Sequence, residues 1–377
     1  MLARLLLAAE TALRGTKQSA PAEVHQVLIL EYQRPLGCCV HLTPLFETLK
    51  RCRPDMKVIL AGHGLPIEIN RYSPFIDALI ATPDPSTDLP AATRSLRGQL
   101  RRRTLIPDCI LTGASDQRTR IALLGFLSSK GWRGGFTIKS NLYHRPLQYD
   151  ASLSLIQNNL RLAKLVGCSN AATHVRVPFG HDELAVAKDL IAQSNSMNRP
   201  VIVMVTQNSG GQSTGWHTDR WSAVIQAADA LGCAVVYVGT KADQPAIAAI
   251  MEAVGGIGVS IAGKTSVTQL AAVLALSDLM VTLDTGTMHV GRAASVPMVV
   301  LGPSWQKPLE WLPLNVENVR ILRGIDRDDV PAGYRLDEIT ADSVVDSMNE
   351  LLAKYPASPH QREMRVSFSL SEVDHSS

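Results

Sequence analysis

Hydrophobic and polar positions along the chain form two series of short apolar runs, separated by longer stretches with helical spacing. The first series predicts strands at 27–31, 57–62, 109–113 and 173–178, and helices around 43–54, 118–129 and 150–166. The second predicts strands at 201–206, 234–239, 259–263, 279–283 and 298–302, and helices near 218–231, 243–253, 266–276 and 287–295. Strands that alternate with helices form parallel sheets covered on both faces. The pattern therefore predicts an α/β protein.

A polar segment, AQSNSMNRP, separates the two series and marks the predicted domain boundary. The chain has 377 residues, enough for two hydrophobic cores, since single cores stop growing below about 250–300 residues. We therefore expect two facing Rossmann-like domains with parallel sheets, at 24–190 and 199–355. Residues 1–23 are expected to form an amphipathic helix. Residues 356–377 are polar and without a period, which predicts a loosely attached tail.

Composition narrows the class of protein. With 46% hydrophobic and 19% charged residues, the chain has the balance of an ordinary globular protein. The formal net charge of +3 is too small to indicate a nucleic-acid partner, and no nucleic-acid-binding motif is present. The cysteines form no CxxC pair, which argues against a zinc ribbon or a thioredoxin site. Their scatter predicts reduced, buried thiols of a cytoplasmic protein: Cys38, Cys39, Cys52, Cys109, Cys168 and Cys233.

Two segments bear on membrane contact. The N-terminal MLARLLLAAETALRGTK has the pattern of a short amphipathic helix, too short to span a bilayer, which needs about 20 apolar residues. Glu10 and Arg14 interrupt its apolar run, and no clear signal-peptide cleavage site follows. Such a helix either packs on the protein or lies on a membrane surface. The segment RSLRGQLRRR carries five arginines, which suit an anionic lipid or a phosphorylated saccharide core, or else form a solvated helix face.

The stretch LDTGTMH carries the strongest chemical signal in the chain. It lies between a predicted strand and a predicted helix, and ligands of parallel α/β sheets bind beyond the carboxyl ends of the strands. Amides at a helix start suit a phosphate; Gly286 allows close approach, and Thr285 and Thr287 add hydroxyls. Asp284 either caps the helix or binds a ligand hydroxyl, and His289 lies on the first turn. The alternative is a plain helix cap without a ligand.

This stretch and its surroundings resemble the C-terminal signature of glycosyltransferase family 9, the ADP-heptose:lipopolysaccharide heptosyltransferases. The run SIAGKTSVTQLAAVLALSDLMVTLDTGTMHVGRAASVPMVVLGPS is similar to the family's AG-T-S run, strand, D-[ST]-G-x-M-H and P-V-V-x-L-F-G-P. VLILEYQRPLGCCVHLTPLFETLKRCRPDMKV resembles the family's first β-α-β unit, SDQRTRIALLGFLSSKGWRGGF its third unit, and DASLSLIQNNLRLAKLVG its interdomain helix. The resemblance extends in order over residues 26–305.

The resemblance implies a GT-B fold and inversion at the anomeric carbon, with no metal and no other cofactor. It implies a nucleotide-diphospho-sugar donor similar to ADP-heptose, bound mainly by the C-terminal domain. The acceptor would be a saccharide or lipid-linked saccharide of the lipopolysaccharide type, on the N-terminal domain. The enzyme would work in the cytoplasm, with a peripheral contact to the inner membrane left open. By this resemblance Thr285, Gly286 and Thr287 hold the diphosphate, with Met288 and His289 beside them.

The chain departs from the family pattern where a catalytic carboxylate is usual. The family's Gly-Asp pair at the start of the first helix is Gly37-Cys38 here, while the Thr-Pro that follows is kept. A thiol is a poor replacement for a carboxylate base, although a helix N-terminus can lower its pKa. His41 lies three residues on, on the same helix face, and imidazole titrates near neutrality; packing is its alternative. Asp116, beyond another strand end, is a second candidate base, with Arg118 beside it as a candidate ligand contact.

Further candidate donor contacts follow the strands of the C-terminal half. The polar loop TQNSGG would place Gln207 and Asn208 over the donor, unless it is a plain connection. In HTDRWS an aspartate replaces the family's basic residue, and Arg220 remains. Asp243, in TKADQ, stands where the family carries an acidic residue near the adenosine ribose, and helix capping is its alternative. Lys264, in AGKTS, follows a strand end and suits a phosphate, unless it is solvated.

Three functions are compatible with these features. The first is the inverting, metal-independent glycosyltransferase that the resemblance implies, with heptose as the sugar. The second is a catalytically degenerate GT-B protein that binds a nucleotide sugar or a protein partner without turnover, which the missing Gly-Asp carboxylate favours. The third is a nucleotide-sugar epimerase of related architecture, whose several acidic cleft residues are not found in the sequence. We expect glycosyl transfer.

Overall fold

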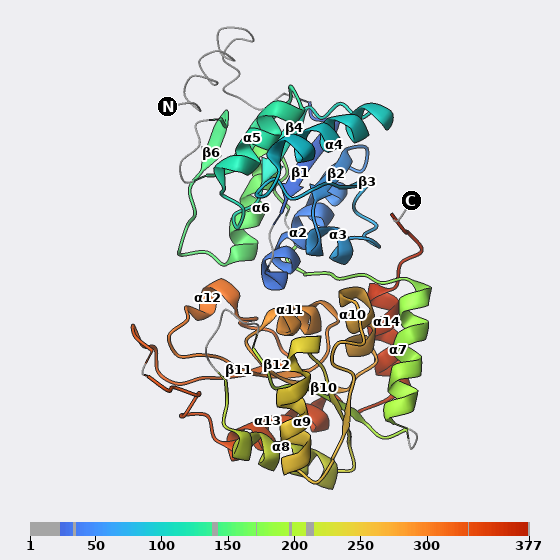
Figure 1. The fold of residues 1–377 in the computed structure, drawn as a ribbon, viewed down its shortest axis with the longest axis vertical. Coiled ribbons are helices and arrows are strands. Elements are labelled where there is room, and N and C mark those ends of the chain that lie inside the picture. Colours follow the sequence, from blue (N-terminus) through green and yellow to red (C-terminus); the bar gives the residue numbers. More distant parts are fainter. Residues whose placement is uncertain are drawn as a thin grey trace. The chain divides into compact units, whose positions relative to one another are not determined.

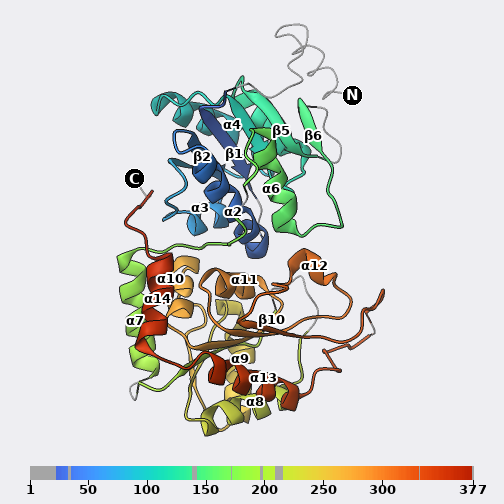
Figure 2. The same cartoon turned by 180° about the vertical axis from the view of Figure 1, so that it is seen from behind.

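The computed structural model describes residues 23–32, 35–137, 142–170, 172–195, 198–208, 215–330 and 332–375. The predicted N-terminal helix at 1–23 lies outside the described residues, except for its last position. The chain divides into two compact units, the first made of Met1–Val175 with Val373–Ser377, and the second of Arg176–Glu372. Each unit holds one parallel sheet covered by helices (Figures 1 and 2). The predicted α/β class with two parallel sheets is confirmed.

The two sheets have the same order of strands. It is β3-β2-β1-β4-β5-β6 in the first unit and β9-β8-β7-β10-β11-β12 in the second, and every pairing is parallel. The first sheet comprises β1 Gln26–Glu31, β2 Lys57–Gly62, β3 Ala78–Ala81, β4 Cys109–Thr112, β5 Trp132–Phe136 and β6 Arg145–Leu147. The second comprises β7 Val201–Val205, β8 Ala234–Tyr237, β9 Val259–Ser260, β10 Leu279–Leu283, β11 Met298–Leu301 and β12 Val319–Leu322.

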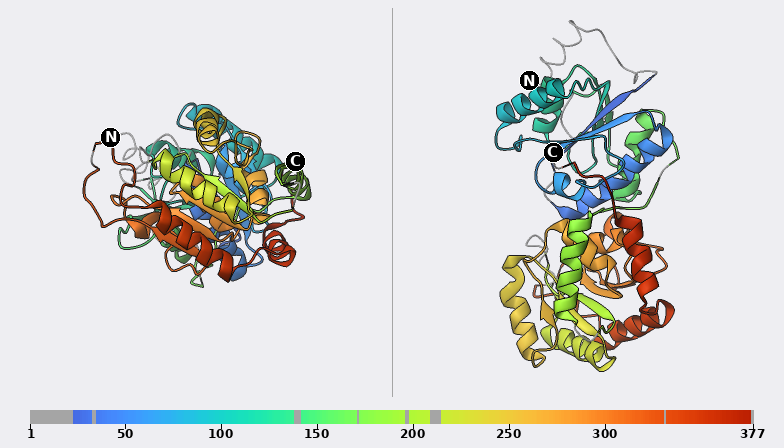
Figure 3. Two further views of the ribbon diagram at one scale, coloured as in Figure 1. Left: turned by 90° about the horizontal axis from the view of Figure 1, so that it is seen from below. Right: turned by 90° about the vertical axis from the view of Figure 1, so that its right-hand side faces the viewer.

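Helices cover both faces of these sheets, as views from other directions also show (Figure 3). The first unit contains α2 Leu36–Cys52, α3 Leu65–Ile69, α4 Leu89–Arg102, α5 Thr119–Ser128 and α6 Leu155–Leu165. The second contains α7 His181–Ser194, α8 Thr218–Ala230, the 3₁₀ turn η1 Lys241–Asp243, α9 Gln244–Ala253, α10 Val267–Ala275, α11 Gly286–Ala293, α12 Pro308–Trp311, α13 Ala341–Lys354 and α14 Pro359–Ser369. Because helices lie on both faces, the central strands β1 and β10 are apolar almost throughout and buried.

Aspartates tie neighbouring strands together at the amino-terminal edge of both sheets. Asp108, just before β4, accepts hydrogen bonds from the amides of His25 and Gln26 at the start of β1, both at 2.9 Å. Asp278, just before β10, accepts from the amide of Val201 at the start of β7, at 2.8 Å. Gln26 and Val201 are the first residues of β1 and β7, so the carboxylates bind backbone donors at the point where each strand begins. The two aspartates therefore hold equivalent strand pairs in register.

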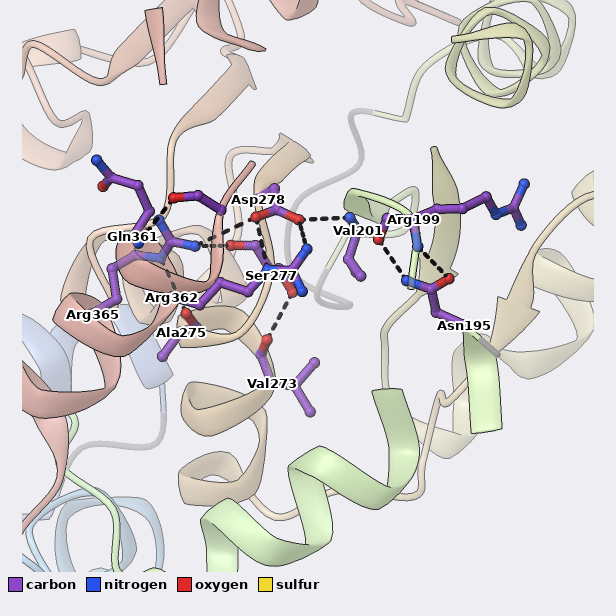
Figure 4. Close-up of polar contacts among 11 residues, drawn as sticks. Asn195, Arg199, Val201, Val273, Ala275, Ser277, Asp278, Gln361, Arg362 and Arg365 are labelled. Atoms are coloured by element: carbon purple, nitrogen blue, oxygen red, sulfur yellow. Dashed lines mark hydrogen bonds and ion pairs between the residues drawn. The ribbon is translucent and has the colours of Figure 1, made fainter. Parts of the chain in front are cut away.

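The Asp278 carboxylate also anchors the C-terminal helix α14 (Figure 4). Arg362 donates to both of its oxygens, from Nε at 2.9 Å and from Nη2. Arg365 donates from Nε to the Ala275 carbonyl at 3.1 Å and from Nη2 to the Ser277 carbonyl. The helix α14 packs on α10, which also contacts α7 (Figures 1 and 2). The expectation of a loosely attached tail at 356–377 is therefore wrong for these residues, because two arginines in a polar-looking stretch bind a buried carboxylate and the end of α10.

The helix α2 contains a proline, Pro44, whose missing hydrogen bond is replaced by a neighbouring side chain. The helix begins at Leu36, earlier than the start at residue 43 that the periodicity predicted. Pro44 has no amide hydrogen and cannot donate to the Val40 carbonyl one turn before it. The hydroxyl of Thr43 donates to that carbonyl instead, at 2.8 Å. Because the missing hydrogen bond is replaced by a neighbour, the helix continues through the proline to Cys52.

Some boundaries differ from the predicted ones. The alternating segment 173–178 forms no strand in its described residues, although Val175 and Val177 are buried as the alternation indicated. Short strands β3, β5, β6 and β12 were not predicted, because they are only three to five residues long or contain glycine, as β5 does. The first unit ends at Val175 rather than at 190, since α7 packs on α10 of the second unit.

A disulfide joins Cys52, the last residue of α2, to Cys168, which follows α6. The Cα atoms are 5.7 Å apart although 116 positions separate the residues in sequence, because α2 and α6 pack against each other. The prediction of six reduced thiols is therefore wrong for this pair, and it no longer supports a reducing compartment. The remaining cysteines are buried thiols: Cys38, Cys39, Cys109 and Cys233. Among the described residues, no helix is long and apolar enough to cross a membrane.

Replacing Arg362 by leucine should destabilise the second unit. The Asp278 side chain is only 1% exposed, and removing its main cationic partner leaves a buried charge poorly compensated. We expect the free energy of unfolding to fall by about 3 kcal/mol, measured by urea denaturation at pH 7. Arg320→Leu is the matched control, because the pair that Arg320 forms with Glu350 is exposed and screened by solvent. Equal losses in both variants would contradict the anchoring role.

The disulfide predicts a definite number of reactive thiols. In denaturant without reductant, the wild-type chain should give four thiols per chain with Ellman's reagent, and six after reduction. Cys52→Ser should give five without reductant, because Cys168 is released, whereas the control Cys109→Ser should give three. Reduction should lower the free energy of unfolding by about 2–4 kcal/mol. Six thiols in the unreduced wild-type protein would rule the disulfide out.

Candidate functional site

Each sheet has one place where the connections leave in opposite directions, and that place is where α/β proteins bind ligands. In the first unit it lies between β1 and β4, and in the second between β7 and β10. The register pairs Leu30 with Thr112 and Val205 with Thr282, so the carboxyl ends of each pair finish at the same level. The residues that follow these four strand ends form two candidate sites, one in each unit.

In the second unit, β10 leads through Asp284 and Thr285 directly into α11. Thr285 is the N-cap residue of α11, yet its side chain makes no capping hydrogen bond. Its Oγ1 and the Oδ2 of Asp284 are both buried without a hydrogen-bond partner among the described residues. Gly286 and Thr287, on the first turn, are half-buried. The Thr285 hydroxyl and the amides at the helix N-terminus can donate to an anionic group of a ligand, whereas Asp284 Oδ2 can accept from a ligand hydroxyl.

Burial shifts the acid–base behaviour of this turn. It raises the pKa of Asp284 to about 6, because removal from water disfavours the charged carboxylate. Burial, with the Arg292 cation as a smaller cause, lowers the pKa of His289 to about 3. His289 is therefore neutral near pH 7, and its ring lies 6.4 Å from that of Trp311 on α12, centroid to centroid. Met288 is fully buried and forms part of the support of this turn.

The neighbouring strand β7 ends in polar residues at the same edge. Thr206 is buried, and Gln207 and Asn208 are half-buried. The Gln207 amide donates to Thr206 Oγ1 at 3.3 Å. The structure thus brings the predicted residues after β7 and β10 to one edge of the sheet. The rest of the predicted loop, Ser209 to Gly211, lies outside the described residues.

The other predicted donor contacts have local partners or lie exposed. Arg220 donates from Nη1 to the carbonyls of Asp337, at 2.8 Å, and Ile339, so this guanidinium holds the loop before α13. Asp243 accepts hydrogen bonds from the amide and the hydroxyl of Thr240, at 2.7 and 2.8 Å. These bonds cap the 3₁₀ turn η1, as the capping alternative to a ligand role predicted. Lys264 is exposed on the turn after β9. A ligand role for these residues stays a prediction.

In the first unit, the predicted residues on α2 are buried. Gly37 and Cys38 lie on its first turn, with Cys38 8% exposed. His41 is 1% exposed, and its carbonyl accepts a hydrogen bond from the Asn159 amide on α6 at 3.2 Å. Asn159 also accepts from the Ala114 amide at 2.8 Å. The packing of α2 against α6 thus extends to the loop after β4.

Asp116 and Arg118 form a clamp across the two strand ends of this unit. Arg118 donates to Asp116 from Nε at 2.8 Å and from Nη2 at 3.2 Å, and Nη2 also donates to the Tyr32 carbonyl at 2.9 Å. The Tyr32 amide donates to Asp116 Oδ2 at 3.0 Å. This bidentate pair raises the pKa of Arg118. The clamp joins the loop after β4 to the residue after β1, and it occupies both oxygens of Asp116.

Glu31, the last residue of β1, was missed by the sequence reasoning. Its carboxyl is 3% exposed, and its Oε2 is buried without a hydrogen-bond partner among the described residues. Burial, reinforced by the negative charge of Asp116, raises the pKa of Glu31 well above its usual range. The available signal was a carboxylate that ends an otherwise apolar strand, VLILE, at the ligand-binding edge of the sheet.

The first unit also has a surface pocket of about 860 Å³, lined by Arg97, Arg101, Pro107 and Lys130 among others. Its residues belong to the end of α4 and to the segments that lead into β4 and β5. It therefore lies at the amino-terminal edge of the sheet, opposite the strand ends described above. Two of its lining residues, Ser128 and Trp132, also carry buried polar atoms without hydrogen-bond partners among the described residues. Parallel α/β sheets nevertheless bind their ligands at the carboxyl edge, so we place the candidate sites there.

Known proteins resemble this chain in sequence and in fold. Lipooligosaccharide heptosyltransferase 2 of Haemophilus influenzae is 27% identical over 167 residues, which is 41% of this chain and 48% of the relative, so the chain spans about half of that relative's length. A glycosyl transferase family 9 structure from Veillonella parvula matches with a TM-score of 0.77 and 17% identity, over 88% of this chain and 98% of its own. The Escherichia coli ADP-heptose lps heptosyltransferase II structure matches with a TM-score of 0.72 and 20% identity, over 88% and 100%.

These structural likenesses establish the GT-B fold that was predicted. The family model for glycosyltransferase family 9 (heptosyltransferase) matches residues 120–329. That match covers more than half of the 377 residues, and it contains β7, β10 and the Asp284–His289 turn. The chain therefore belongs to glycosyltransferase family 9.

Proposed function

We propose that this protein transfers a sugar from a nucleotide-diphospho-sugar to a saccharide acceptor, with the donor bound at the carboxyl edge of the second sheet. The observation that carries the proposal is the turn after β10, where the Thr285 hydroxyl is buried without a hydrogen-bond partner among the described residues at the N-terminus of α11. Asp284 Oδ2, buried beside it and likewise without a partner there, is an acceptor suited to a ligand hydroxyl. A diphosphate would accept hydrogen bonds from the first amides of α11 and from the hydroxyls of Thr285 and Thr287. The same groups would stabilise the diphosphate as it leaves.

The sugar is proposed to be heptose and the nucleotide ADP. This rests on the heptosyltransferase family to which the chain belongs, and on the E. coli relative, which is described as an ADP-heptose lps heptosyltransferase. The adenosine would lie over Gln207 and Asn208 at the end of β7, with Asp243 and Lys264 as further candidate contacts. Inversion at the anomeric carbon and a reaction without a metal ion are part of the same proposal.

The acceptor is proposed to be a saccharide of the lipopolysaccharide type that binds the first unit near the ends of β1 and β4. A cytoplasmic location with peripheral contact to the inner membrane suits such an acceptor. The exposed arginines on and after α4 lie toward the opposite, amino-terminal edge of this sheet, so they are a candidate surface for anionic lipid and not for the reacting end of the acceptor: Arg94, Arg97, Arg101, Arg102 and Arg103. Arg103 also donates to the Leu79 carbonyl at 3.2 Å, which fixes one end of this surface.

A second candidate function is nucleotide-sugar binding without turnover. One observation favours it: Cys38 stands on the first turn of α2 where the family motif carries a catalytic aspartate. Cys38, His41 and Asp116 stay predictions as replacement bases, although Asp116 is occupied by Arg118 and by the Tyr32 amide. Measurements of donor binding and of ADP release on the same preparation separate the two functions, because a degenerate protein would bind the donor and release nothing.

Replacing Thr287 by glutamate should block the donor site. A carboxylate on the first turn of α11 would occupy the helix amides and repel a diphosphate, while stabilising the helix itself. By calorimetric titration, the wild-type protein should bind ADP in preference to UDP and GDP, and Thr287→Glu should weaken ADP binding at least about tenfold. Thr119→Glu, at the first residue of α5 in the other unit, is the matched control and should bind ADP normally. Failure of the wild-type protein to bind any of the three nucleotides would refute the donor site.

The raised pKa of Asp284 predicts a pH dependence of donor binding. Below about pH 6 the carboxyl is neutral, and above that pH its charge opposes an anionic diphosphate. Binding of an ADP-sugar, whose diphosphate does not titrate in this range, should therefore weaken about tenfold between pH 5 and pH 7.5. Asp284→Asn should bind equally at both pH values. Tighter binding at the higher pH would instead show that the ionised Asp284 accepts a hydrogen bond from the ligand.

A further inference from the structure

A buried carboxyl in the first unit lacks any structural role that would explain it. Glu31 ends β1, and the strand residues before it, Val27 to Leu30, are apolar and fully buried. Its Oε2 has no hydrogen-bond partner in the described part of the chain, and the side chain forms no ion pair there. Burying such a group costs stability unless it is paired. A group that is retained at this cost, at a ligand-binding edge, is a candidate for function.

Glu31 lines a small cavity together with Cys38, Ser115, Asp116 and Asn159. The cavity measures about 10 Å³, which is roughly the room that one water-sized group occupies. Asp116 is held by Arg118 and the Tyr32 amide, and both polar groups of the Asn159 side chain are bonded to backbone. Glu31 is thus the carboxyl of this cavity that is available to a hydroxyl entering it.

The surroundings of Glu31 also tune its proton affinity. The groups that face it are Cys38 and Cys39 on α2, and Asp116 on the loop after β4, whose charge Arg118 balances. Burial raises the pKa of Glu31, and the nearby Asp116 charge adds to the effect. A carboxyl with a raised pKa binds a proton more strongly than an ordinary glutamate, which is the property that a general base near neutral pH requires.

We propose that Glu31 is the general base of the transfer reaction, supplying from β1 the carboxylate that Cys38 does not supply from α2. This inference rests on the glycosyltransferase function proposed above. The acceptor hydroxyl occupies the small cavity, and its oxygen forms a bond to the anomeric carbon of the donor. The bond from that carbon to the diphosphate oxygen breaks, and the electron pair leaves with the nucleoside diphosphate. The hydroxyl proton passes to Glu31 Oε2 and is later released to water.

The test compares Glu31→Gln with Glu183→Gln in the full-length protein. Glu183 is a suitable control because it is 8% exposed, its Oε2 is likewise buried without a partner among the described residues, and it lies on α7 in the other unit. ADP release is measured with ADP-heptose and a deacylated lipopolysaccharide core saccharide, and ADP binding is measured by calorimetry. Glu31→Gln should lower kcat by about 10²–10⁴-fold and leave ADP binding within twofold. Glu183→Gln should change neither.

Two further readouts separate a base from a structural residue. The kcat of the wild-type enzyme should fall as pH decreases through the raised pKa of Glu31, because a base must be ionised, and this limb should be absent in Glu31→Gln. Formate should restore part of the activity of Glu31→Ala, since a small carboxylate can enter the enlarged cavity. If a folded Glu31→Gln enzyme keeps its kcat within about fivefold, Glu31 is not the base, while the proposed transfer reaction still stands. A wild-type protein that neither binds ADP nor releases it would overturn the proposed function, and this role with it.

Discussion

One hydrogen-bond pattern underlies both candidate sites: an aspartate that holds the two central strands of each sheet at their amino ends. Asp108 binds the first amides of β1, and Asp278 binds the first amide of β7. Because strands in a sheet have a fixed rise per residue, a register fixed at one edge also fixes which residues emerge at the other. The polar residues at the carboxyl edges are therefore positioned in part by groups at the opposite edge of the sheet.

The two edges that result are chemically different although their strand order is the same. In the second unit the turn after β10 offers a helix start, two threonines and a neutral His289, which together suit an anion. In the first unit the corresponding turn after β4 carries the Asp116–Arg118 clamp, and Glu31 ends the neighbouring strand. A leaving diphosphate needs hydrogen-bond donors, whereas an attacking hydroxyl needs a proton acceptor. The proposed placement of the donor in the second unit and of the acceptor in the first therefore rests on which residues end equivalent strands.

Much of this was predictable from the sequence, and the failures have physical causes. Long apolar runs located β1, β2, β7 and β10 to within a residue, since burial on both faces leaves little choice of residue type. Periodicity began α2 only at residue 43, whereas the family resemblance placed the helix start at Gly37-Cys38, close to the observed Leu36. That the helix continues through Pro44 depends on the Thr43 hydroxyl, which only the structure reveals. The turn after β10 was found through its motif, whereas Glu31 was not, because the carboxyl ends an apolar strand and its isolation is visible only in three dimensions. The Cys52–Cys168 bond depends in the same way on helix packing.

The replacement of one hydrogen bond in α2 couples two neighbouring positions energetically. With Pro44 in place, loss of the Thr43 hydroxyl would leave the Val40 carbonyl without its usual donor inside a buried helix. If an alanine replaced Pro44, the restored amide would bind that carbonyl and the hydroxyl would become dispensable. The effect of changing either residue therefore depends on the other, a case of epistasis within a single turn. If both residues are replaced during evolution, only one order avoids an intermediate with an unsatisfied Val40 carbonyl: Pro44 must change before Thr43.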